Sequence, residues 1–89
     1  MIKQQIEIIN MLGLHARAAA KLVTTAAAYQ AEVRLDYADQ SADAKSIMSV
    51  MMLAAAKGSS IIISCDGDDE RAAMTALQEL INDKFGEEE

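Results

Sequence analysis

The chain has 89 residues, of which 52% are hydrophobic and 25% charged, and its formal net charge is −6. This length is enough for one compact domain and too short for two, so we expect a single domain over residues 1–89 without a deep substrate pocket. The acidic balance excludes the usual nucleic-acid binder or anionic-membrane binder, because both classes depend on clustered Lys and Arg side chains.

The first half of the chain predicts a strand, a helix and two more strands. Apolar and polar residues alternate over residues 2–9, which is typical of a half-buried strand that ends at the turn 10–13. Apolar residues recur at helical spacing over residues 16–29 and predict the first helix. They are Ala19, Leu22, Val23, Ala26 and Tyr29. Alternation then predicts a second strand over residues 31–37, and a weaker third strand is expected at 40–43.

A second, short helix and a fourth strand are predicted next. Ser46 stands where an N-cap belongs, before an apolar segment over residues 47–56 that should end at Lys57-Gly58. Residues 60–65 are rich in β-branched side chains and predict a strand. Cys65 lies in that strand, and we expect it to be a buried packing residue.

The last segment predicts a third helix and a polar tail. Asp68, Asp69 and Glu70 should begin the helix, since acidic residues favour its N-terminal end. Its buried stripe should be Met74, Leu77 and Ile81. Lys84 and Gly86 suit the end of the helix, and we expect the acidic tail 87–89 to fray.

The element order β-α-β-β-α-β-α, with short connections, favours an α+β fold. We expect one four-stranded antiparallel sheet with one face covered by three helices. A functional site should then lie at a loop or a helix end.

The cysteine and histidine counts limit the chemistry further. One cysteine cannot form an internal disulfide, and Cys65 and His15 are too few for a four-ligand zinc site, so we expect no metal and no cofactor. Met1 leads directly into the first alternating pattern. We therefore expect neither a signal peptide nor a spanning helix, and we expect a cytoplasmic protein.

The start of the first helix is the candidate site, because the sequence offers it no Ser, Thr, Asp or Asn cap. His15 and Arg17 stand there instead, after the turn residue Gly13. Backbone N–H groups of Ala16, Arg17 and Ala18, the helix dipole and the guanidinium would stabilise a phosphate on or near His15. A neutral imidazole is itself a nucleophile, so one histidine suffices for accepting a phosphoryl group. The alternative is that His15 is only a loop residue.

A family resemblance favours the functional interpretation. The run from Gly13 to Val23, Gly-Leu-His-Ala-Arg-Ala-Ala-Ala-Lys-Leu-Val, resembles the active-site signature of HPr, the histidine phosphocarrier of the bacterial sugar phosphotransferase system. The segment Lys45 to Met51, Lys-Ser-Ile-Met-Ser-Val-Met, resembles the regulatory-serine signature of the same family, and Ala56-Lys57-Gly58 resembles the turn after its second helix. The likeness covers essentially the whole chain.

The resemblance implies an open-faced β-sandwich and a carrier, not an enzyme that turns over a small molecule. His15 would be phosphorylated on Nδ1 by Enzyme I and would donate to EIIA-type proteins, with Arg17 stabilising the phosphate. Ser46 would match the serine that HPr kinase/phosphorylase modifies in some bacteria. Serine at an N-cap is also explained as a cap alone.

A docking surface is the remaining expectation. The methionines of the second helix exceed what one buried stripe can hold, so some should be exposed and suit several partners. The candidate docking residues are Ala20, Ile47, Met48, Met51 and Met52. Core filling is the alternative. We expect a monomer, since transfer needs small interfaces that dissociate quickly.

The chain departs from the family signature at position 18, and two other functions are alternatives. Ala18 stands where the family usually has proline, and we expect the exchange to be tolerated because alanine suits a helix start. Besides a sugar-branch carrier, a nitrogen-branch carrier of the same fold (NPr-like) and a regulatory protein-binding adaptor remain alternatives. An adaptor relying only on Ser46 would not need His15.

Overall fold

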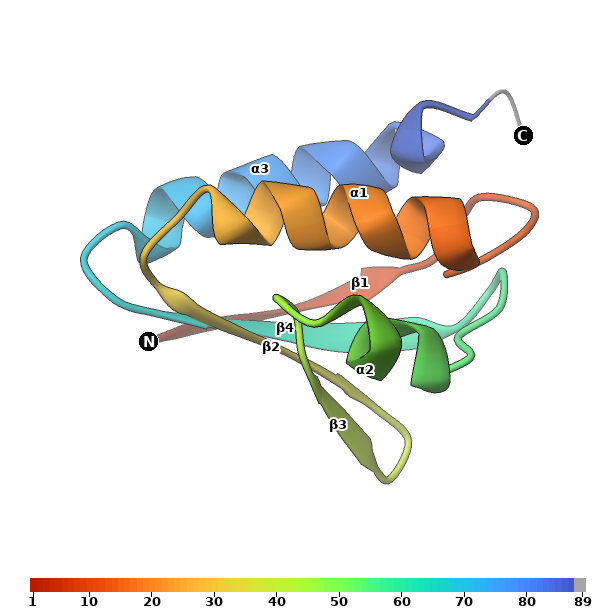
Figure 1. Cartoon of the computed structure of the whole chain (residues 1–89), viewed down its shortest axis with the longest axis horizontal. Coiled ribbons are helices and arrows are strands. Elements are labelled where there is room, and N and C mark those ends of the chain that lie inside the picture. Colours follow the sequence, from red (N-terminus) through yellow and green to blue (C-terminus); the bar gives the residue numbers. More distant parts are fainter. Residues whose placement is uncertain (88–89) are drawn as a thin grey trace.

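A computed structural model describes residues 1–87, which form a four-stranded sheet and a layer of helices (Figure 1). All strand pairs are antiparallel, and the strand order is β1-β4-β2-β3. The predicted α+β fold is therefore confirmed. The elements are β1 (Ile2–Glu7), α1 (Ala16–Ala27), β2 (Glu32–Tyr37), β3 (Gln40–Asp43), α2 (Ile47–Met52), β4 (Ser60–Asp66), α3 (Glu70–Asn82) and a short 3-10 helix, η1 (Lys84–Gly86).

The sheet presents one apolar face to the helices, as the period-two pattern requires. In β4, Ile61 and Ile63 are fully buried, whereas Ile62 between them is exposed on the open face. Leu35 of β2 lies opposite Ile63 of β4 and opposite Ala42 of β3, and all three side chains are buried. This register fixes which side of the sheet receives the helices.

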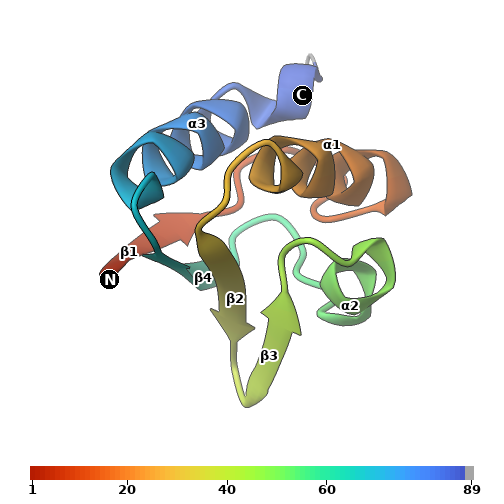
Figure 2. The same cartoon turned by 60° about the vertical axis from the view of Figure 1, so that its left-hand side comes forward.

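Helices α1 and α3 lie side by side across that face, and α2 packs against α1 and β3 (Figures 1 and 2). The helix residues that close the core include Leu22 of α1, Val50 of α2 and Leu77 of α3, all fully buried. The chain then turns back after α3, and the buried ring of Phe85 in η1 adds to the same core. This places the C-terminal segment near the start of α1.

The first helix ends at Ala27, two residues before the predicted end at Tyr29. The N–H groups of Ala28 and Tyr29 donate to carbonyls three residues back, which tightens and closes the helix. The next two amides, of Gln30 and Ala31, donate to the carboxylate of Asp69 instead of continuing the helix.

The second helix is shorter than predicted: it ends at Met52, not near Ala56. Ala54 takes a left-handed conformation with φ of 53°, which an α-helix cannot contain. The following carbonyl, of Ala55, is buried and accepts from the Leu14 amide at 2.9 Å. A contact with a distant loop, which local composition does not encode, therefore decides where this helix stops.

The third helix and the tail follow the predictions in part. Met74, Leu77 and Ile81 are buried as expected, and Cys65 is buried, which raises the pKa of its thiol. The expectation of a fraying tail concerned three residues, of which 88 and 89 lie outside the described residues. Glu87 is described and is held against the body of the protein.

Candidate functional site

His15 is the N-cap residue of α1 and lies at the surface. Its backbone is extended (φ −73°, ψ 176°), and its carbonyl accepts from the Ala19 amide at 2.8 Å, so the helix starts immediately after it. The side chain makes no capping hydrogen bond and is 27% exposed. The imidazole is therefore accessible while its backbone is fixed by the helix.

The first amides of α1 remain available to an anion. Ala16, Arg17 and Ala18 have no carbonyl four residues earlier in the helix, and within residues 1–87 no side chain accepts from their N–H groups. The first turn carries no acidic side chain. No side chain of this first turn therefore opposes its partial positive charge, which favours a phosphate.

The loop before His15 is pinned to the segment after α2. Gly13 has φ of +65°, and a Cβ atom there would lie 2.5 Å from the carbonyl oxygen of Ala55. The neighbouring Leu14 amide donates to that same oxygen, and the Leu14 side chain is buried. Only glycine permits this approach, which brings the end of α2 beside His15.

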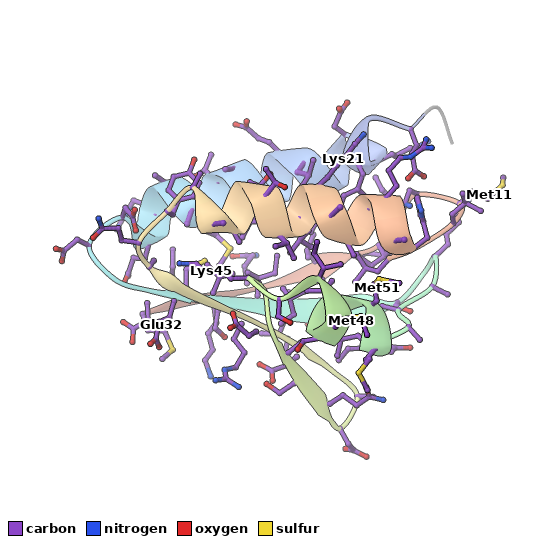
Figure 3. The ribbon with its side chains drawn as sticks, in the orientation of Figure 1. Met11, Lys21, Glu32, Lys45, Met48 and Met51 are labelled. Carbon is purple, nitrogen blue, oxygen red and sulfur yellow. The ribbon has the colours of Figure 1, made fainter. Side chains whose placement is uncertain are left out.

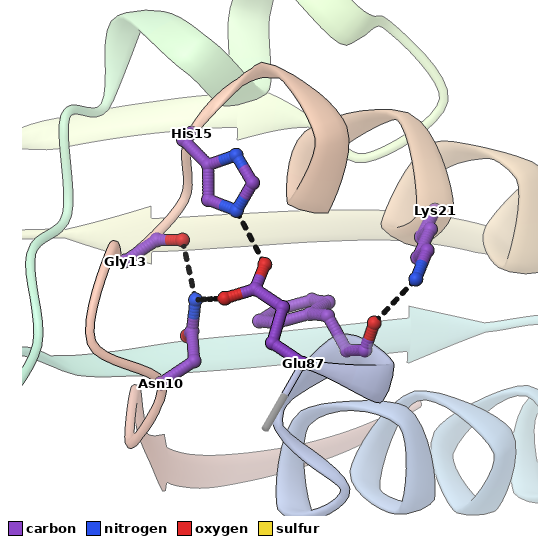
Figure 4. A network of polar contacts seen from close by, with 6 residues as sticks. Asn10, Gly13, His15, Lys21 and Glu87 are labelled. Carbon is purple, nitrogen blue, oxygen red and sulfur yellow. Dashed lines mark hydrogen bonds and ion pairs between the residues drawn. The ribbon is translucent and has the colours of Figure 1, made fainter. Parts of the chain in front are cut away.

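A carboxylate that sequence reasoning missed contacts the ring. Glu87 Oε2 accepts a hydrogen bond from His15 Nε2, and Glu87 Oε1 accepts from Asn10 Nδ2 at 3.1 Å (Figure 4). The hydrogen bond from His15 is the main cause that lowers the pKa of Glu87, with a smaller contribution from Asn10. One signal in the sequence could have predicted that the tail is anchored. Phe85, the only phenylalanine of the chain, lies in an otherwise polar C-terminal segment.

Arg17 is exposed, and among residues 1–87 it makes no hydrogen bond to the His15 ring. It lines a shallow groove on α1 together with Ala20, Lys21 and Leu80. Among the described residues the guanidinium has no hydrogen bond or ion pair. It is thus two residues from His15 along the chain and available to a bound anion.

Ser46 is the N-cap of α2, as predicted, and its hydroxyl accepts from the Ser49 amide at 3.3 Å. The predicted exposure of the methionines is also confirmed (Figure 3). The exposed apolar residues of α2, with exposed fractions from 38% to 72%, are Ile47, Met48, Met51 and Met52. We call these four residues the α2 patch.

Two further exposed apolar residues, Met11 and Leu12, were not predicted. They occupy the turn between β1 and α1, four and three residues before His15. The available signal was a pair of adjacent apolar residues inside a predicted turn. They enlarge the apolar surface on the side of His15 that precedes the helix.

Residues 1–87 hold no group of three or more His, Cys, Asp or Glu side chains suited to a metal ion. Within the same residues, no helix is both long and apolar enough to cross a bilayer.

Comparison with known proteins shows which family this chain is similar to. Residues 2–83 match the family model described as PTS HPr component phosphorylation site. The chain is 55% identical to the phosphocarrier protein HPr of Neisseria meningitidis over the full length of both, and 52% identical to that of Pseudomonas aeruginosa over 96% of each. The crystal structure of HPr-C-His from Thermoanaerobacter tengcongensis superposes with a TM-score of 0.96 at 43% identity, covering all of both chains.

Proposed function

Since this chain belongs to the HPr family of phosphocarrier proteins, we propose that His15 Nδ1 accepts a phosphoryl group from phospho-Enzyme I and passes it to an EIIA-type protein. A phosphocarrier is charged and discharged by its partners and is not itself a catalytic enzyme.

One observation carries the proposal: an accessible imidazole stands at a helix start whose first amides are unpaired among the described residues. The Nε2 atom is occupied by Glu87, so Nδ1 is the ring nitrogen left for the phosphoryl group. Figure 4 shows Nδ1 on the side of the ring opposite to that carboxylate. Each charge-assisted hydrogen bond from an amide to a phosphate oxygen contributes about 1.5–3 kcal/mol.

In the transfer step, His15 itself is the nucleophile. The lone pair of Nδ1 forms the N–P bond as the bond from phosphorus to the donor breaks, and the ring takes a positive charge. Amides of Ala16, Arg17 and Ala18 and the Arg17 guanidinium stabilise the phosphate oxygens. Donation reverses the step, and the electron pair of the N–P bond returns to Nδ1.

The test is incubation with Enzyme I and phosphoenolpyruvate, with His15→Ala as the paired variant. We expect an acid-labile, alkali-stable phosphoryl modification in the parent protein and none in His15→Ala. Absence of the modification in the parent, or equal modification of the variant, would refute the assignment. A panel of purified sugar-branch and nitrogen-branch Enzyme I proteins, compared by rate, would identify the branch.

We propose the α2 patch, with Ala20, as the surface on which donor and acceptor dock. Four exposed apolar side chains on one short helix, three of them flexible methionines, support this assignment. Met48→Ala should weaken binding to Enzyme I, measured by titration calorimetry, and leave the unfolding temperature unchanged. Unchanged affinity would exclude Met48 from the interface.

We propose Ser46 as a regulatory phosphorylation site for an HPr kinase/phosphorylase. Phosphate would be accepted at this helix start, yet it would place negative charge beside the α2 patch. Ser46→Asp should therefore dock more weakly and transfer more slowly while staying folded. A Ser46→Asp protein that binds Enzyme I and is charged like the parent would count against this role.

A further inference from the structure

The C-terminal segment is anchored to the start of α1 by a turn and a buried ring. Lys84, Phe85 and Gly86 all have positive φ (56°, 56° and 78°), which reverses the chain after α3. The Phe85 side chain is fully buried, and its carbonyl accepts from Lys21 Nζ at 2.6 Å (Figure 4). This anchored turn fixes the position of the next residue, Glu87.

The Glu87 carboxylate is held from two sides. Asn10 Nδ2 donates to Oε1 and, at 2.8 Å, to the Gly13 carbonyl, so the Asn10 amide bridges the turn and the carboxylate. His15 Nε2 donates to Oε2. Both donors lie in the segment that precedes α1, 77 and 72 residues away from Glu87 in sequence, and the Glu87 side chain is only 17% exposed.

This arrangement selects one form of the imidazole. An ionised carboxylate only accepts hydrogen bonds, so the ring proton belongs on Nε2 and the lone pair belongs on Nδ1. The carboxylate is ionised at neutral pH, because the bond from His15 holds the pKa of Glu87 below its ordinary value. The Lys21 ammonium adds to this effect. The nucleophilic atom then faces away from Glu87.

The same carboxylate meets the charge that develops during transfer. When neutral imidazole attacks phosphorus through Nδ1, the positive charge is shared by both ring nitrogens, and the proton stays on Nε2. A negative carboxylate hydrogen-bonded to Nε2 stabilises that cation, in the way the aspartate of a Ser-His-Asp triad stabilises imidazolium. It acts from the side of the ring that the phosphate does not approach.

We propose that Glu87 is a positioning residue for phosphoryl transfer, which orients His15, fixes its Nε2–H tautomer and balances the ring charge when Nδ1 carries phosphate. This inference rests on the proposed function of His15. It assigns to the C-terminal tail a role that the local sequence around the active-site histidine does not suggest.

The experiment compares the full-length parent with Glu87→Ala, which removes the acceptor and the charge, and Glu87→Gln, which keeps an acceptor oxygen without the charge. Glu79→Gln is the matched control, because it removes one acidic group from an exposed position on α3. Two quantities are measured: the tautomer ratio of the uncharged His15 ring by 15N NMR, and the initial rate of charging by Enzyme I and phosphoenolpyruvate.

We expect the Nε2–H tautomer to dominate in the parent, in Glu79→Gln and in Glu87→Gln, and to lose population in Glu87→Ala. The charging rate should fall about tenfold in Glu87→Ala, by analogy with the lower end of the loss seen when the hydrogen-bond partner of a metal-bound histidine is removed. Glu87→Gln should be intermediate, since it keeps the orientation and loses the charge, and Glu79→Gln should match the parent.

Equal charging rates for the parent and Glu87→Ala would overturn the proposal, whatever the tautomer ratio. An Nδ1–H tautomer dominating in the parent would overturn it as well. A parent protein that is not charged at all would refute the proposed function of His15 and, with it, the role of Glu87. If the parent is charged and Glu87→Ala is charged at the same rate, only the role of Glu87 is refuted.

Discussion

At the scale of single residues, the orientation of His15 is set by neighbours from three separate segments. Gly13 lets the preceding loop touch the carbonyl of Ala55, Asn10 holds the Glu87 carboxylate, and that carboxylate holds Nε2. None of the three contacts is a cap on α1. The amides at the start of α1 therefore stay available to an incoming anion, while the His15 ring is held in one orientation.

Replacing Gly13 by alanine tests the loop contact. The new Cβ would meet backbone atoms at 2.5 and 2.8 Å while the residue keeps a positive φ, so we expect a loss of about 2 kcal/mol or more in the free energy of unfolding. Gly58→Ala is the control, because its φ is also positive (+91°) but, apart from its chain neighbours, no other atom of the described residues lies within 4 Å of the new Cβ, and a loss of about 1 kcal/mol is expected. Urea unfolding measures both values. If both variants lose the same free energy of unfolding, the close approach of Gly13 to Ala55 does not contribute to the stability.

At the scale of elements, Asp69 ties the start of α3 to the entry of β2. Its two carboxylate oxygens accept from the Gln30 and Ala31 amides, both at 2.8 Å, although the residue is the N-cap of its own helix. Glu70 accepts from the Gly67 amide close by. Asp69 thus connects the start of α3 to β2, and Glu70 closes the turn before its own helix.

The Asp69 contact predicts a pH dependence of stability. The Gln30 amide, and after it the Ala31 amide, lowers the pKa of Asp69 from its ordinary value of 3.8, so the carboxylate is favoured in the folded state. The stabilisation is complete above that ordinary value and is lost as pH falls through the lower, folded-state pKa.

The measurement is urea unfolding of the parent and of Asp69→Asn, from neutral pH down to about 2. The parent should be more stable at neutral pH, and the difference should shrink in the acid range. Asp68→Asn is the control, since Asp68 is exposed and the described residues give its side chain no hydrogen bond. A difference independent of pH would contradict the carboxylate explanation.

The start of α1 also predicts that Ala18 is no obstacle to charging. Ala18 is the third residue of α1, where a proline would remove only an amide that the helix leaves unpaired. Because Ala18 keeps that amide for the phosphate, the parent should be charged by Enzyme I at least as fast as Ala18→Pro. A rate near background in the parent alone would show that the position requires proline.

At the scale of the whole molecule, the C-terminal turn closes the helical layer and the site together. Phe85 is fully buried in the core that α1, α3 and the sheet share, and its carbonyl is bonded to Lys21 of α1. The same turn carries Glu87 to His15. Core stability and the geometry of the site are thus linked through one segment.

Phe85→Ala tests this link. Removing a fully buried ring should cost about 3–5 kcal/mol in the free energy of unfolding. The tail should also lose its anchor, so the Nε2–H tautomer of His15 should lose population in the variant that is still folded. Phe85→Leu, which keeps an apolar side chain, should show smaller changes in both. If Phe85→Ala is destabilised but the tautomer ratio of His15 is unchanged, the buried ring does not control the geometry of the site and the proposed link is wrong.

Much of the fold was predictable because its signals are local. Several of these signals involve residues that are neighbours in sequence: alternation over β2, the β-branched run of β4, helical spacing in α1 and α3, and Ser46 before α2. The structure confirms the elements that they predict. The open start of α1 was visible for the same reason. Local patterns are therefore enough to predict the set of elements, their order, the buried faces and the position of His15 at a helix end.

The contacts between distant segments became visible only in the folded chain. The early end of α2 depends on the Ala55 carbonyl pairing with Leu14, and the early end of α1 is followed by amides that pair with Asp69. Glu87 reaches a histidine 72 residues away. Such contacts depend on the path of the whole chain, because a hydrogen bond forms between atoms that packing brings together, and no local pattern specifies that pairing.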